Sequence, residues 1–225
     1  MNSLKKNILL IGSDSEIAQN FLNYATNRND NLITVSRKKI SSVKSNKHYS
    51  VDLANSEEVN KLVQNIKSFD FDTFIYCPGI FIPKNTIEIT HDEIESQINV
   101  NLVSAICLSI PVLQKMTKNG RGMMLFIGSS SAYSGFKKTS LYCSAKHGLL
   151  GFTRSLCDEF RNLGIRISCI SPGSINTKMS IPLHKNMDPK TFILPNEISK
   201  LLVDLVYFPN DSMWQEEIIL KRLKY

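Results

Sequence analysis

The stretch "NILLIGSDSEIAQNFLNYATNRNDNLITVS", residues 7–36, decides the fold. Its two ends, 7–12 and 31–36, are short apolar runs of strand length. Between them, from 15 to 28, apolar side chains recur at the spacing that places them on one face of a helix. A strand, a helix and a second strand in this order predict a βαβ unit with two parallel strands.

The same alternation continues along the rest of the chain. Further strands are expected at 48–53, 72–77, 122–128, 165–171 and 216–221. Further helices are expected at 56–69, 92–118, 140–163 and 196–208, the second of them bent at Pro111. Because the strands are apolar throughout, we expect a parallel sheet that is covered on both faces. The expected fold class is α/β, a doubly wound parallel sheet of about seven strands.

Length and composition favour one globular domain. The chain has 225 residues, 42% of them hydrophobic, and no linker or repeat divides it, so 1–225 is interpreted as one domain. The one long irregular segment, 178–195, contains three prolines and is expected to cover the substrate as a lid. No apolar stretch approaches the ~20 residues needed to span a bilayer. We therefore expect a cytoplasmic protein that does not contact membranes.

Charge and cysteine content exclude several kinds of site. The net charge is +7, which by itself fits nucleic acid, a membrane surface or an anionic small substrate. The basic residues are scattered, without a dense tract and interleaved aromatic residues, so nucleic acid is not expected. The five cysteines are odd in number and form no CxxC pair. Free thiols in a reducing compartment are expected, with no disulfide and no metal site.

The strongest chemical signal is "SLYCSAKHG", residues 140–148, on an expected helix. Tyr142 and Lys146 are four residues apart, so their side chains share one helix face. A nearby ammonium lowers the pKa of a phenol and enables it to exchange a proton with a carbonyl or an alcohol. Ser129 lies thirteen residues before Tyr142, directly after an expected strand. Parallel sheets bind ligands at that end of their strands.

These elements, with the glycine turn at Gly12, "NVNL" at 99–102 and "PGSINT" at 172–177, resemble the short-chain dehydrogenase/reductase family in its compact single-domain branch. The resemblance extends from Lys6 to about Lys221. It implies a Rossmann-type domain and an oxidoreductase that uses a nicotinamide dinucleotide.

The resemblance also assigns catalytic roles. Tyr142 corresponds to the general acid/base, and Lys146 to the residue that lowers its pKa and binds the nicotinamide ribose. Ser129 corresponds to the hydroxyl that orients the substrate; Ser130 and Ser131 are rivals, but only Ser129 has the expected spacing to Tyr142. Asn101 corresponds to an asparagine that anchors a water in a proton relay toward Lys146.

Cofactor contacts follow from the same resemblance. "VDLAN" at 51–55 supplies an adenine contact, "PG" at 78–79 follows a strand, and Thr177 with Ile175 contacts the nicotinamide carboxamide. The full set of expected cofactor residues is Gly12, Asp14, Ser15, Ile17, Ser36, Arg37, Asp52, Leu53, Pro78, Gly79, Tyr142, Lys146, Pro172, Gly173, Ile175 and Thr177.

The opening turn departs from the family pattern, which carries three glycines. Glu16 and Ala18 replace two of them, and Pro78 stands in the segment where the family has Asn-Asn-Ala-Gly. Ser13 and Glu16 have the spacing of a capping box. We therefore expect Glu16 to cap the helix, with its charge weakening a pyrophosphate site that still works.

The residues after the second strand favour NADP over NAD. An acidic residue there would bind the ribose 2′-hydroxyl of NAD, whereas this chain has "SRKK", Ser36 to Lys39. The guanidinium of Arg37 suits a 2′-phosphate. An ordinary basic loop in a basic protein is the alternative.

The expected activity is the NADP-dependent interconversion of a carbonyl and a secondary alcohol. A protein that binds dinucleotide without turnover, as a sensor or scaffold, is the alternative. An anionic small-molecule substrate is expected because six basic residues fall near the site: Lys137, Lys138, Lys178, His184, Lys185 and Lys190. The family resemblance implies a homodimer or homotetramer that pairs the helices at 92–118 and 140–163. The atypical C-terminus, "MWQEEIILKRLKY", puts the tetramer contact in doubt.

Overall fold

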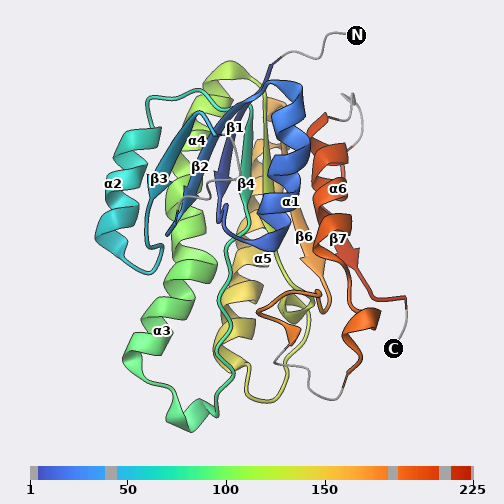
Figure 1. Cartoon of the computed structure of the whole chain (residues 1–225). Coiled ribbons are helices and arrows are strands. Elements are labelled where there is room, and N and C mark those ends of the chain that lie inside the picture. Colours follow the sequence, from blue (N-terminus) through green and yellow to red (C-terminus); the bar gives the residue numbers. More distant parts are fainter. Residues whose placement is uncertain (1–4, 39–44, 182–186, 208–213, 224–225) are drawn as a thin grey trace.

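The computed structural model describes residues 5–38, 45–181, 187–207 and 214–223 (Figure 1). Seven strands form one sheet in the order β3-β2-β1-β4-β5-β6-β7. Every neighbouring pair is parallel. The expected doubly wound parallel sheet is confirmed. The strand order reverses its direction between β1 and β4, which in such sheets opens a crevice at the carboxyl ends of the strands.

The elements alternate along the chain as expected. The strands are β1 Asn7–Ile11, β2 Asn31–Ser36, β3 Lys47–Ser50, β4 Thr73–Tyr76, β5 Gly122–Ile127, β6 Ile165–Pro172 and β7 Glu217–Leu220. The α-helices are α1 Glu16–Ala25, α2 Ser56–Ile66, α3 His91–Ile98, α4 Ser104–Asn119, α5 Ser140–Phe160 and α6 Pro195–Tyr207.

Two apolar layers cover the sheet. On one face α1 and α6 lie side by side (Figure 1), and Phe21 and Leu202 of these helices pack on Leu10 and Ile75 of the sheet. On the other face α2, α4 and α5 pack on alternate residues of the same strands. Because both faces are buried, strands β1, β4 and β5 are apolar apart from their first residues, Asn7, Thr73 and Gly122.

The long helix expected at 92–118 differs from the expectation. It runs from 91 to 119, but residues Asn99–Val103 form a π-helical turn between α3 and α4. The helix continues through Pro111. The irregularity therefore lies at 99–103, and its contacts are described below with the site.

Strand β3 and helix α1 end earlier than the sequence predicts. Strand β3 ends at Ser50 rather than at residue 53, and as an edge strand it is only partly buried. Helix α1 ends at Ala25, and a short 3-10 turn carries the chain to Asn29, which adopts a left-handed backbone.

The continuous helix His91–Asn119 is long and apolar enough to cross a membrane by length and composition alone, contrary to our expectation. More than half of its most apolar stretch is buried inside the protein. A core helix that covers a sheet passes the same test.

The five cysteines are free thiols, as expected. Burial raises the pKa of Cys77 and of Cys157 to about 12 and raises the pKa of Cys169. Within the described part of the chain, no group of three or more His, Cys, Asp or Glu residues could hold a metal ion.

Candidate active site

The candidate site begins where the neighbouring strands β1 and β4 end. Gly12 has a φ of 75°, a left-handed conformation that favours glycine. A Cβ atom at Gly12 would lie 2.9 Å from the Cγ and the N of Pro78. Gly12 is thus required twice, by its backbone conformation and by the close approach of the turn after β4.

The capping box expected in the opening turn is not formed. The N-cap of α1 is Ser15, whose hydroxyl accepts the N–H of Ala18 at 3.2 Å. The Ser13 hydroxyl instead donates to the hydroxyl of Ser36 at 2.9 Å. The carboxylate of Glu16 accepts the backbone N–H of Lys178 at 2.9 Å. The prediction was wrong because Ser13 turns toward β2 and Glu16 toward the segment after β6.

The start of α1 supplies donors for an anion. Ser15 satisfies the N–H of Ala18 and, through its carbonyl, that of Gln19. The N–H groups of Glu16 and Ile17 have no partner within the helix, as is general for a first helical turn. Such donors and the helix dipole suit a phosphate. The side chain of Ile17 is buried in the core below the turn, and Asp14 is exposed.

The end of β2 exposes a cation. Ser36 is buried and its hydroxyl donates to the carbonyl of Lys38 at 2.8 Å, which shapes the turn. Arg37 is exposed, and its guanidinium forms no ion pair with any residue that the structure describes. Lys39 lies outside the described residues.

The turn after β3 is built by its own side chains. The Asp52 carboxylate accepts the N–H of Ala54 at 3.0 Å, and the Asp52 N–H donates to Glu58 at 2.8 Å. The Leu53 side chain is buried in the core. A ligand at this turn would therefore meet the exposed Asp52 and the backbone of Leu53, not the Leu53 side chain.

Ser129, Tyr142 and Lys146 converge above the ends of β5 and β4. The Ser129 hydroxyl hydrogen-bonds with the Tyr142 phenol and also accepts the N–H of Ser131 at 3.1 Å. The Lys146 ammonium lies 5.7 Å from the centre of the Tyr142 ring and donates to the Ile127 carbonyl at 3.0 Å. Lys146 is only 2% exposed, so a charged group lies inside the protein.

Burial has the largest effect on the pKa values of Tyr142 and Lys146. It raises the pKa of Tyr142 to about 12, although the hydrogen bond with Ser129 acts in the opposite direction. It also lowers the pKa of Lys146 to about 8. The phenol pKa is therefore raised, and the expected lowering was wrong, because desolvation outweighs the opposing effect of Ser129.

Asn101 lies beside Lys146 but is held by the backbone. Its amide donates to the carbonyls of Ile80 at 2.8 Å and Gln97 at 2.9 Å, and its oxygen accepts the Ile80 N–H at 3.3 Å. A Cβ atom at Gly79 would lie 3.4 Å from the Asn101 oxygen and 3.8 Å from the Lys146 nitrogen. Asn101 thus fixes the segment after β4, and only a second lone pair of its oxygen remains for a water.

The π-helical turn that carries Asn101 has its own supports. The Tyr76 hydroxyl donates to the carbonyl of Val100 at 2.6 Å and lies 2.6 Å from the Ser104 hydroxyl. The Ser104 hydroxyl donates to the Asn99 carbonyl at 2.7 Å. Tyr76 was not identified from the sequence, where it reads as an ordinary apolar strand residue.

A second residue that the sequence did not reveal is Phe81, whose ring packs edge-on at 4.7 Å from the ring of Tyr142. The aromatic contact helps to bury the phenol. Its only sequence signal is its place two residues after the "PG" at 78–79.

The turn after β6 approaches the same edge of the sheet. Pro172 is the last residue of β6, and the N–H of Gly173 donates to the Leu220 carbonyl at 2.9 Å. Ile175 pairs with Ile193 in an isolated bridge. The Thr177 hydroxyl accepts the N–H of Ser180 at 3.2 Å.

The structure describes only part of the expected basic residues and of the expected lid. Lys137, Lys138, Lys178 and Lys190 are exposed, whereas His184 and Lys185 lie outside the described residues. The expected lid, 178–195, is described only in part, and its described portion contains the 3-10 turn Pro189–Thr191.

A family model and curated relatives match much of the chain. The model of the short chain dehydrogenase family matches residues 11–188. A 3-oxoacyl-[acyl-carrier-protein] reductase of Buchnera aphidicola is 36% identical over 132 residues, which are 58% of this chain and 54% of that protein. The reductase of the same name from Rickettsia bellii is 28% identical over 68% of this chain and 66% of its own length. The chain thus spans between about half and two thirds of these curated relatives.

Solved structures show the same fold. A 4-hydroxyisoleucine dehydrogenase complexed with NADH has a TM-score of 0.85 at 23% identity, over 96% of this chain and 97% of that one. ElxO with NADP bound has a TM-score of 0.83 at 23% identity, over 97% and 98%.

Proposed function

Because the chain belongs to the short-chain dehydrogenase family, we propose that it is an oxidoreductase that interconverts a carbonyl and a secondary alcohol with a nicotinamide dinucleotide. The observation that carries the proposal is the convergence of Ser129, Tyr142 and a buried Lys146 beside Gly79. A binding protein without turnover has no need to keep a lysine 2% exposed next to a phenol.

The residues present fit a dinucleotide. The N–H groups of Glu16 and Ile17 at the start of α1, directly after the turn at Gly12, would hold the pyrophosphate. Asp52 would contact the adenine, and Thr177 with Ile175 the nicotinamide. The bound nicotinamide supplies or accepts the hydride.

The side chains of this chain handle the proton. In the reductive direction the Tyr142 hydroxyl donates its proton to the carbonyl oxygen as that oxygen becomes an alcohol. The Ser129 hydroxyl, which already hydrogen-bonds with the phenol, donates to the same oxygen and holds it beside Tyr142. The Lys146 ammonium stabilises the phenolate that remains.

The protonation states of Tyr142 and Lys146 at neutral pH are those from which the reductive step starts. With a pKa of about 12, the Tyr142 phenol is fully protonated at neutral pH and therefore carries the proton that reduction consumes. With a pKa of about 8, Lys146 is mostly charged at pH 7. Both groups are therefore in the state that a carbonyl reductase requires.

We propose NADP as the preferred cofactor. Arg37 is exposed at the end of β2, and the neighbouring Ser36 is neutral. A guanidinium there can bind a 2′-phosphate through two hydrogen bonds. Titration of the purified protein with NADPH and NADH tests this choice, and equal dissociation constants would contradict it.

The substrate that we propose is an anionic carbonyl compound, such as a 3-oxoacyl group on an acyl carrier. Support comes from two relatives named as 3-oxoacyl-[acyl-carrier-protein] reductases and from the exposed Lys137 and Lys138 after β5. Consumption of NADPH with a 3-oxoacyl thioester, compared with a neutral ketone, tests the proposal.

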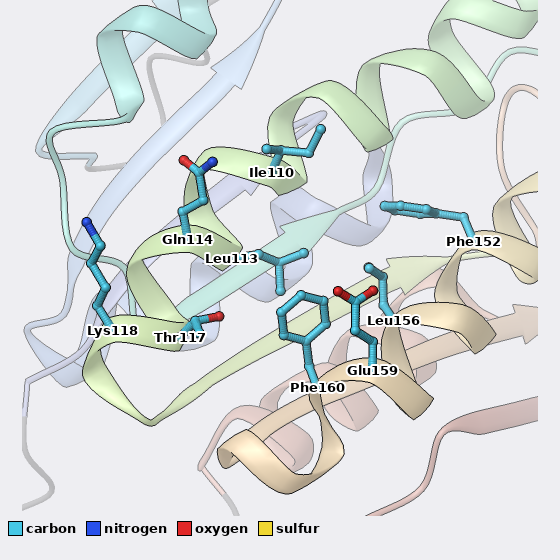
Figure 2. A pocket seen from close by; sticks show the side chains of 9 residues that line it. All are labelled: Ile110, Leu113, Gln114, Thr117, Lys118, Phe152, Leu156, Glu159 and Phe160. Carbon is cyan, nitrogen blue, oxygen red and sulfur yellow. The ribbon is translucent and has the colours of Figure 1, made fainter.

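We also propose that the protein pairs with a second copy through α4 and α5. An apolar groove of about 680 Å³ lies between these helices (Figure 2). Its walls are Ile110, Leu113, Phe152, Leu156 and Phe160, with Gln114, Thr117, Lys118 and Glu159 around them. Ile110 is 49% exposed, and burying such a side chain favours association. Sedimentation of the wild type and of Ile110→Glu tests the pairing.

A further inference from the structure

The carboxylate of Glu16 joins two parts of the candidate site that are 162 residues apart in the chain. Glu16 is the first residue of α1, directly after the phosphate turn. Its Oε1 atom accepts the backbone N–H of Lys178 at 2.9 Å. Lys178 follows Thr177, the residue expected to contact the nicotinamide.

The bond is important because, in the described part of the chain, few other hydrogen bonds hold this part of the segment after β6. The first half, 174–176, is fixed to the region near Ile193: the Ser174 carbonyl accepts the Ile193 N–H at 3.0 Å, and the Asn176 N–H donates to Ile193 at 2.8 Å. The second half, 177–181, bonds mainly to itself, from Ser180 and Ile181 back to the Thr177 carbonyl. Among the residues that the structure describes, Glu16 provides the hydrogen bond that ties 177–181 to another element.

We propose that Glu16 is a positioning residue, whose carboxylate holds the segment 177–181 against the start of α1 and so places Thr177 over the cofactor. The inference rests on the proposed function, because Thr177 matters only if a dinucleotide binds there. It reverses the role expected from the sequence, in which Glu16 was a helix cap that merely weakened the site.

Two opposing effects of the carboxylate can be separated by the choice of substitution. Its negative charge lies near the free N–H groups of α1, where it repels a pyrophosphate. Its oxygen holds Lys178 in place. Glu16→Gln removes the charge and keeps the acceptor at the same reach. Glu16→Asp keeps the charge but is one methylene too short, and Glu16→Ala removes both.

The test is a titration of each variant with NADPH. We expect Glu16→Gln to bind at least as tightly as the wild type. Glu16→Asp, which keeps the charge, should bind about threefold to tenfold more weakly than the wild type, the effect of losing one hydrogen bond. Glu16→Ala, which loses the charge as well, should bind more weakly than Glu16→Gln by the same factor. Glu197→Ala is the matched control, because Glu197 accepts the Leu194 N–H at the same 2.9 Å near the start of α6. The control should leave the dissociation constant unchanged.

Amide exchange in the cofactor-free protein gives a second measurement. The peptide that contains 174–181 should exchange faster in Glu16→Ala than in the wild type or Glu16→Gln. The inference is overturned if Glu16→Ala binds NADPH as tightly as Glu16→Gln, if Glu16→Asp binds it as tightly as the wild type, or if that peptide exchanges at an unchanged rate in Glu16→Ala. If the unmodified protein binds neither NADPH nor NADH, the proposed function fails, and the role of Thr177 fails with it.

Discussion

Replacing Lys146 with methionine should make the protein more stable at neutral pH. Lys146 is 2% exposed, and burial lowers its pKa from 10.5 to about 8. Each tenfold change in proton affinity corresponds to about 1.4 kcal/mol, so holding the ammonium inside the protein at pH 7 costs about 3 kcal/mol. Methionine has a similar length and no charge. It loses the hydrogen bond from the charged ammonium to the Ile127 carbonyl. Such a bond contributes about 1.5 kcal/mol or more, so up to about 1.5 kcal/mol of net stabilisation remains.

The sign of the pH dependence follows from proton uptake. Between pH 8 and pH 10.5 the unfolded chain binds a proton at Lys146 that the folded protein has released. The free energy of unfolding of the wild type therefore rises with pH in this window relative to the variant. Below pH 8 the cost of Lys146 is present in full, and above pH 10.5 it vanishes. The advantage of Lys146→Met should shrink from pH 7 to pH 9.5.

Urea unfolding followed by the fluorescence of the single tryptophan, Trp214, measures this difference. Trp214 is partly buried, and its indole N–H donates to the Ile167 carbonyl, so unfolding changes its surroundings. Lys61→Met, at an exposed position on α2, is the control and should change stability by less than about 0.5 kcal/mol. A Lys146→Met variant that is less stable than the wild type at pH 7, or equally shifted at pH 7 and pH 9.5, would refute the reasoning.

Three further predictions address the site and its supports. Tyr142→Phe should lower turnover by about 10²- to 10⁴-fold while the dissociation constant for NADPH stays within about twofold; a variant with half the wild-type rate contradicts the assigned role. Arg37→Ala should weaken NADPH by about tenfold or more and leave NADH unchanged, as measured by parallel titrations; equal losses for both cofactors speak against a 2′-phosphate contact. Gly12→Ala should lower the melting temperature and weaken both cofactors, because its φ of 75° and the 2.9 Å approach of Pro78 leave no room for a Cβ atom; an unchanged melting temperature would show that the turn can relax.

The sheet could be predicted from the sequence because apolar runs of strand length alternate with helical periodicity over the whole chain. Strand β2, Asn31–Ser36, has the expected bounds. The prediction for strand β3 ended three residues too late, at 53 instead of Ser50. An edge strand is only half covered, and the sequence does not show which strand lies at the edge. The π-helical turn at 99–103 was missed because one extra residue leaves no compositional signal.

The chemistry of the site could be predicted only in part. The structure brings Ser129, Tyr142 and Lys146 together, as the spacing required. The direction of the Tyr142 pKa shift was wrong because it depends on burial, which comes from packing against residues such as Phe81. The partner of Glu16 could not be predicted either, because it lies in a segment 162 residues away.

The π-helical turn rotates the side chains of α4 about the helix axis, relative to those of α3, away from the positions that a regular helix would give them. Each residue of an α-helix advances by about 100° around the axis, so the extra residue within 99–103 offsets α3 from α4 by about that angle. Deleting a single residue there would restore regular winding without changing the apolar composition. It would also turn Asn101 away from Ile80 and leave the Tyr76 hydroxyl without the Val100 carbonyl. The number of residues in this turn therefore matters as much as their identity. An alignment of related chains that places a gap in the turn would also misalign the residues of the candidate site.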